Sequence, residues 1–86
     1  MSSRDDISAA FTREAFGLRA LVCECGIKPE DADDVVQDVF LAAIERADDI
    51  NGSLTGWLRN RARMVAKNYL RDAATADRAL NYLANH

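Results

Sequence analysis

The sequence predicts an all-α fold, a compact bundle of three to four helices. Apolar residues recur at steps of three or four along most of the chain, which is typical of helices with one buried side. The 86 residues include one proline and four glycines, so helix breakers are few. A chain of this length forms one domain. We expect residues 1–86 to be that domain, with helices at about 5–25, 29–47, 54–72 and 74–85.

The first expected helix has a single apolar stripe. Its members follow one another at helical spacing and are Ile7, Phe11, Ala15, Leu18, Val22 and Cys25. Gly26 comes directly afterwards and is a natural residue to end a helix, because glycine adopts the left-handed conformation easily.

The second expected helix begins at Pro29, a favoured first helical position. Acidic residues crowd its first turns, where negative charge suits the helix dipole. Its apolar side comprises Ala32, Val35, Val36, Val39, Phe40, Ala43, Ile44 and Ala47. Its opposite side presents Asp34, Gln37, Asp38 and Glu45.

The third expected helix follows an Asn51-Gly52 turn signal, and Ser53 or Thr55 is suited to cap it. Its apolar side comprises Leu54, Trp57, Leu58, Ala62, Val65, Tyr69 and Leu70. Its basic residues recur every four positions as Arg59, Arg63, Lys67 and Arg71. The tail over 74–85 has no proline or glycine, so it is either a short fourth helix or a continuation of the third.

Charge is divided unevenly along the chain. Residues 1–52 carry 5 basic and 12 acidic side chains, and residues 53–86 carry 6 basic and 2 acidic ones. This asymmetry indicates either two different partners or two faces that neutralise each other within the fold. The basic stripe beside Trp57 and Tyr69 suits nucleic-acid phosphates and bases, but it also suits a solvated face paired with the acidic helix.

Catalytic and metal sites find no support in the sequence. The single histidine is His86, so no Ser/His/Asp or Cys/His set can form, and no glycine-rich phosphate loop is present. Cys23 and Cys25 are two apart, which suits neither a mutual disulfide nor a zinc site. We therefore predict a protein that is not an enzyme and has no cofactor and no metal. Without a signal peptide or an apolar span, we expect a cytoplasmic protein with no membrane partner.

Two segments resemble a known family. Residues 31–40 read Asp-Ala-Asp-Asp-Val-Val-Gln-Asp-Val-Phe, which resembles the D-A-E-D-[LV]-[VL]-Q-[ED]-x-F signature of extracytoplasmic-function sigma factors. Residues 57–71 begin Trp-Leu-Arg-Asn-Arg-Ala-Arg and end Leu-Arg, which resembles that family's W-L-x-x-I-A-R-N-x-x-x-D-x-L-R segment. The order and the spacing agree, and the resemblance covers about residues 7–75.

The resemblance implies a sigma region 2 domain. In that family the acidic helix docks on the clamp helices of the RNA polymerase β′ subunit. The tryptophan-bearing helix and the loop before it engage the promoter −10 element, which is partly single-stranded and has one base flipped into that loop. The implied polymerase-binding residues are Asp31, Asp33, Asp34, Gln37 and Asp38. The implied DNA-binding residues are Asn51, Gly52, Ser53, Trp57, Arg59, Asn60, Arg63, Lys67 and Arg71.

Three positions of the second segment depart from the family. Met64 stands where the family has asparagine, Asn68 where it has aspartate, and Arg61 where it has isoleucine. An alternative function is therefore a stand-alone region 2 mimic that acts only by protein–protein contact, without sequence-specific DNA reading. It would be a split-sigma co-regulator with a separate region 4 protein, or a binder of polymerase or an anti-sigma factor. A helical domain unrelated to sigma factors is the third alternative.

Overall fold

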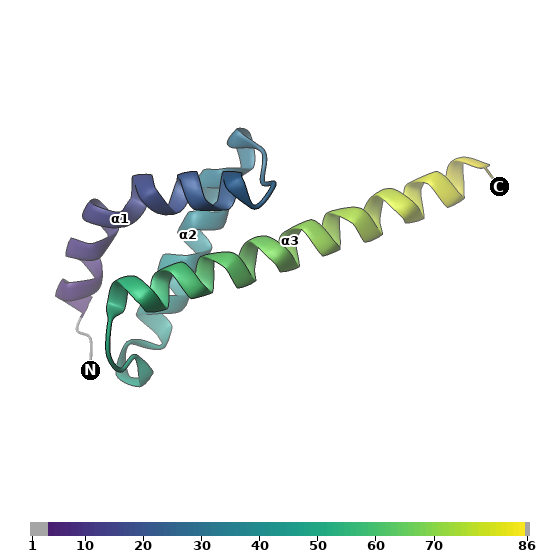
Figure 1. The fold of residues 1–86 in the computed structure, drawn as a ribbon. Coiled ribbons are helices and arrows are strands. Elements are labelled where there is room, and N and C mark those ends of the chain that lie inside the picture. Colours follow the sequence, from purple (N-terminus) through teal and green to yellow (C-terminus); the bar gives the residue numbers. More distant parts are fainter. Residues whose placement is uncertain (1–3, 86) are drawn as a thin grey trace.

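The computed structural model describes residues 4–85, and this part of the chain is helical with no strand. The helices are α1 (Arg4–Glu24), α2 (Pro29–Glu45) and α3 (Leu54–Asn85), and a single 3₁₀ turn, η1 (Ala47–Asp49), follows α2. Each α-helix packs on the other two, and α2 crosses behind α1 and α3 (Figure 1). The predicted all-α bundle is confirmed, with three helices.

Helix α1 ends as its sequence predicts. Gly26 has a φ of +112°, its N–H donates to the Cys23 carbonyl, and the Ile27 N–H donates to the Val22 carbonyl. This pair of bonds is the Schellman motif, which satisfies carbonyls that the last turn leaves without partners. Ile27 and Val22 are both buried, so the two apolar residues that accompany the motif also belong to the hydrophobic core. Cys23 and Cys25 are free thiols.

Helix α2 contributes most to the core. Its buried residues are Ala32, Val35, Val36, Val39, Phe40, Ala42 and Ala43. From α1 and α3 they meet Ile7, Ala10, Leu18, Val22, Leu58, Ala62 and Ala66, and Ile50 closes the lower end. Many of these residues are alanine or valine, so the helix axes can approach closely. Phe11 lies at the rim with its ring edge-on to Phe40, with ring centroids 4.4 Å apart.

Helix α3 is one continuous helix of 32 residues, so the separate fourth helix expected over 74–85 is wrong. The physical reason is local. Residues 73–85 include five alanines and no proline or glycine, so nothing interrupts the backbone hydrogen bonds.

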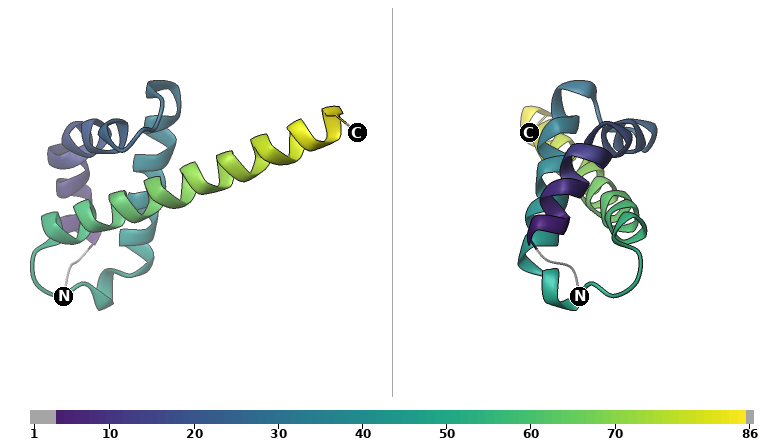
Figure 2. Two further views of the ribbon diagram at one scale, coloured as in Figure 1. Left: turned by 45° about the vertical axis from the view of Figure 1, so that its right-hand side comes forward. Right: turned by 90° about the vertical axis from the view of Figure 1, so that its left-hand side faces the viewer.

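The second half of α3 leaves the body of the protein. Every residue from 71 to 85 is exposed, including Leu80 and Leu83, which share a face. Figures 1 and 2 show this half projecting beyond α1 and α2. The radius of gyration is 15.2 Å, whereas a compact chain of this length has about 12 Å. The projecting half accounts for this excess.

Candidate functional site

The outer side of α2 presents an exposed acidic face. Asp34, Gln37, Asp38 and Glu45 are all exposed and lie opposite the buried side of the helix. Leu41 lies among them, one turn after Gln37 and Asp38, and 53% of its surface is exposed. An apolar residue surrounded by charged and amide groups is the usual composition of a protein-binding surface.

Two of the predicted acidic residues, Asp31 and Asp33, face other groups of this chain. Asp33 pairs with Arg19 of α1, with 3.1 Å between the carboxylate Oδ1 and Nε, and Arg19 also donates to the Pro29 carbonyl. Asp31 lies on the side facing α3, where it lines a pocket with Tyr69. Hydrogen bonding to Asp31, and then partial burial and the charges of Asp31, Asp34 and Glu30, raise the pKa of Tyr69.

The four regularly spaced basic residues of α3 are all exposed. They are Arg59, Arg63, Lys67 and Arg71. They extend over about 18 Å at roughly 1.5 Å per residue. Asn60 lies beside them, and Arg63 Nη1 donates to its Oδ1 at 3.3 Å. These two side chains, both among the DNA-binding residues that the resemblance implies, are therefore adjacent.

The loop before α3 is held by its own side chains. Gly52 has a φ of +78°, which favours glycine. Ser53 Oγ accepts a hydrogen bond from the Gly56 N–H at 3.1 Å, so Ser53 is the N-cap and Thr55 is not. Thr55 instead donates to Glu14 of α1 at 3.1 Å. Asn51, Gly52 and Ser53 are exposed.

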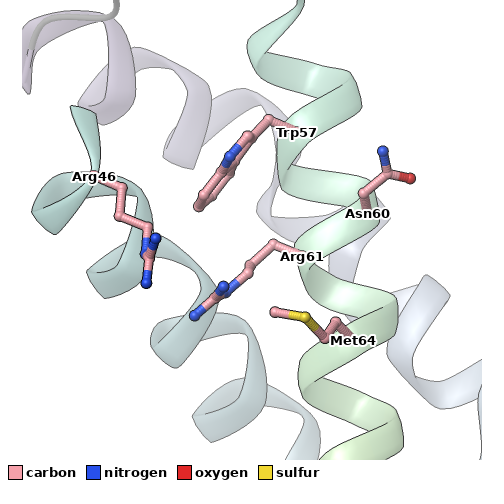
Figure 3. A pocket seen from close by; sticks show the side chains of 5 residues that line it. All are labelled: Arg46, Trp57, Asn60, Arg61 and Met64. Atoms are coloured by element: carbon pink, nitrogen blue, oxygen red, sulfur yellow. The ribbon is translucent and has the colours of Figure 1, made fainter. Parts of the chain in front are cut away.

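An open pocket of about 240 Å³ lies between Arg46, at the end of α2, and the first turns of α3. Its lining residues are Arg46, Trp57, Asn60, Arg61 and Met64, and Figure 3 shows the Arg46 and Arg61 side chains extending into the same space. The Arg61 guanidinium carbon is 6.0 Å from the centre of the Trp57 ring. Trp57 is half-buried and also packs on the core.

The acidic and basic helices do not neutralise each other. Among residues 4–85 the ion pairs are Arg13–Glu14, Arg19–Asp33 and Arg71–Asp72, and none joins α2 to α3. The two charged faces therefore remain available to partners from outside the molecule.

Comparison with known proteins decides the family. The family model described as Sigma-70 region 2 matches residues 11–75, well over half of the chain. The chain belongs to the sigma-70 region 2 family. No curated protein and no solved structure matches it. Sigma region 2 is a non-enzymatic domain of transcription initiation, which binds RNA polymerase and promoter DNA.

In this sigma region 2 domain, the match includes all of α2 and the part of α3 that packs on the body. The unrelated helical domain that we considered from the sequence is thereby excluded. Among residues 4–85, no helix is long and apolar enough to cross a membrane.

Sequence reasoning missed two residues of these surfaces. Leu41 looks like an ordinary member of an amphipathic helix, and only its position opposite Val39 and Ala43 in the helical period indicates exposure. Arg46 follows α2 in sequence, and nothing in its neighbours predicts that it lies across from Arg61 of α3.

Proposed function

We propose that the chain is the region 2 domain of an extracytoplasmic-function sigma factor that acts in the cytoplasm. It docks on the clamp helices of the RNA polymerase β′ subunit through α2 and engages a promoter −10 element through α3. The observation that carries the proposal is the presence of two exposed charged faces, acidic on α2 and basic on α3, with no ion pair between them among residues 4–85, within one sigma region 2 fold.

The docking half of the proposal rests on the outer side of α2. Asp34 and Asp38 are one turn apart, and neither has an ion-pair partner among residues 4–85. Carboxylates fixed on a rigid helix suit arginines of a partner coiled coil, because charge-assisted hydrogen bonds are strong and directional. Gln37 adds an amide, and Leu41 supplies apolar area at the centre. Asp31 and Asp33 are expected to act at the margin, because each already faces a group of this chain.

Charge reversal tests the docking half. The variant carrying Asp34→Lys and Asp38→Lys should lose affinity for the isolated clamp helices by on the order of 100-fold. The matched control carries Asp72→Lys and Asp77→Lys, which make the same charge change on the exposed half of α3. Equal binding by both variants in a pull-down or titration would remove α2 from the interface.

The DNA half rests on the exposed basic residues of α3 and on the loop before it. A single strand with a −10-like sequence should bind the wild-type chain with an affinity that falls steeply with salt. Replacing Arg59, Arg63 and Lys67 by alanine should weaken binding and reduce the slope of log K against log salt by about 0.7 for each lost phosphate contact. Unchanged binding would refute the role of this face.

A second function is favoured by one specific feature of α3. Met64 is 43% exposed in the segment where the family carries an asparagine, so part of the expected base-reading surface is apolar. A protein that binds only polymerase or an anti-sigma factor, alone or beside a separate region 4 protein, would still use the α2 face. It would bind the clamp helices and show no preference between a −10-like strand and a scrambled one.

A further inference from the structure

The pocket between α2 and α3 has an unusual electrostatic composition. The guanidinium groups of Arg46 and Arg61 extend into it, and the side chains of Trp57 and Met64 line it (Figure 3). Neither guanidinium has an ion-pair or hydrogen-bond partner in the described part of the chain. Two like charges that share one pocket repel each other, and an anion between them would reverse the sign of that interaction.

Arg61 carries the strongest sign of a missing partner. Its Nε–H is shielded from solvent and has no acceptor, although the residue as a whole is half-buried. Leaving a charged donor buried without an acceptor costs free energy, and folded proteins rarely tolerate this unless the group has another role. The position is also where the resembling family has an isoleucine, which would cost nothing to bury.

The remaining lining residues define the ligand class. Guanidinium groups match the geometry of phosphate oxygens. The Arg61 guanidinium carbon lies 6.0 Å from the centre of the Trp57 ring, and the exposed part of this half-buried indole suits contact with the sugar and base attached to a phosphate. Asn60 also lines the pocket, and its amide points away from the two guanidinium groups (Figure 3). An apolar ligand would leave both cations unsatisfied, and a carboxylate ligand would make no use of the indole.

We propose that this pocket holds one phosphate of a single DNA strand, clamped between Arg46 and Arg61 with its nucleoside against Trp57. The inference rests on the proposed function, because it assumes that α3 binds a DNA strand. It adds a contact that neither the basic stripe nor the loop at residues 51–53 provides, since the phosphate would lie toward α2. Arg61 then lowers the stability of the free protein and binds the phosphate when the strand is present.

The position of Trp57 allows a direct test, because it is the only tryptophan in the chain. Its fluorescence should change when the full chain is titrated with a −10-like single strand, and the change should be lost with a strand of neutral methylphosphonate linkages. Arg61→Ile and Arg46→Ala should each weaken strand binding about tenfold or more. Arg78→Ile, which removes one charge from the projecting half of α3, is the matched control and should bind like the wild type.

Stability gives a second measurement that separates a binding role from a structural one. Arg61→Ile should unfold at the same or a higher denaturant concentration than the wild type, because a buried donor without an acceptor is replaced by an apolar group. A lower unfolding midpoint together with wild-type strand affinity would overturn the proposal. So would a fluorescence response to inorganic phosphate with none to the strand.

The two proposals fail in different ways. If the variant lacking Arg59, Arg63 and Lys67 loses strand binding while Arg61→Ile does not, the phosphate pocket is refuted and the DNA role stands. If the strand does not bind at any salt concentration, the DNA half of the proposed function fails and the pocket fails with it.

Discussion

The outer face of α2 and the outer face of α3 differ in how they are built. The α2 face is a set of carboxylates and an amide around the exposed Leu41, on a helix whose opposite side is buried along its length. The α3 face is a row of cations, and its helix packs on the body only as far as Leu70. The first composition suits a protein partner with a fixed shape, and the second suits a flexible polyanion. One small core therefore presents two surfaces whose compositions suit chemically different partners.

The largest expected effect removes both faces together. Leu58 is fully buried where the three helices meet. Leu58→Ala should cost about 2–5 kcal/mol of unfolding free energy, out of roughly 4–13 kcal/mol for a domain of this size. Denaturant unfolding followed by circular dichroism measures the loss, and binding to the clamp helices and to the DNA strand should fall together.

The matched control for that variant is Leu83→Ala. Leu83 is 70% exposed on the projecting half of α3, so its replacement should change the unfolding free energy by no more than about 0.5 kcal/mol. Equal losses for the two variants would mean that the projecting half packs against the body in solution.

A smaller effect should separate the two faces. Leu41→Ser removes the apolar centre of the α2 face, and burial of a leucine at an interface contributes about 1.5–3 kcal/mol. Affinity for the clamp helices should therefore fall roughly tenfold to a hundredfold, while strand binding and stability stay the same. Phe16→Ser, at an exposed position on α1, is the control. If both variants weaken docking alike, exposed apolar area in general matters and the α2 face has no special role.

The smallest effect concerns the junction between the two helices. Hydrogen bonding to Asp31 holds the pKa of Tyr69 above 10.0, the value of an isolated tyrosine. Because the folded-state pKa is the higher one, this interaction stabilises the fold fully below about pH 10, and its contribution is lost as pH rises through the folded-state pKa. Alkaline titration by ultraviolet absorbance measures it in a Tyr82→Phe background, where Tyr69 is the only tyrosine.

Replacing Asp31 distinguishes its two possible roles. Asp31→Asn should lower the pKa of Tyr69 toward 10.0 and leave clamp-helix binding nearly unchanged, because Asp31 faces α3. Loss of docking with no change in the Tyr69 titration would mean that Asp31 binds the clamp helices and does not act on Tyr69.

Much of the fold follows from short-range chemistry. Pro29 begins α2, Gly26 ends α1 and Ser53 caps α3, and each does so through contacts within a few residues. The apolar period also predicts most of the core, because a helix buries one side whatever it packs against. Phe11 and Ile44 are exceptions: both match the period and both remain more than a third exposed, since they lie at the rim between α1 and α2.

The tertiary structure alone decided which side chains from different parts of the chain meet. The sequence by itself determined the helices, their apolar sides, the acidic and basic stripes and the resemblance to sigma region 2. It could not place Asp31 against Tyr69, Thr55 against Glu14, or Arg46 across from Arg61. Those pairs are 12 or more residues apart, so their proximity depends on how the helices cross. Local propensity and periodicity carry no information about that crossing, because it depends on side-chain packing among all three helices.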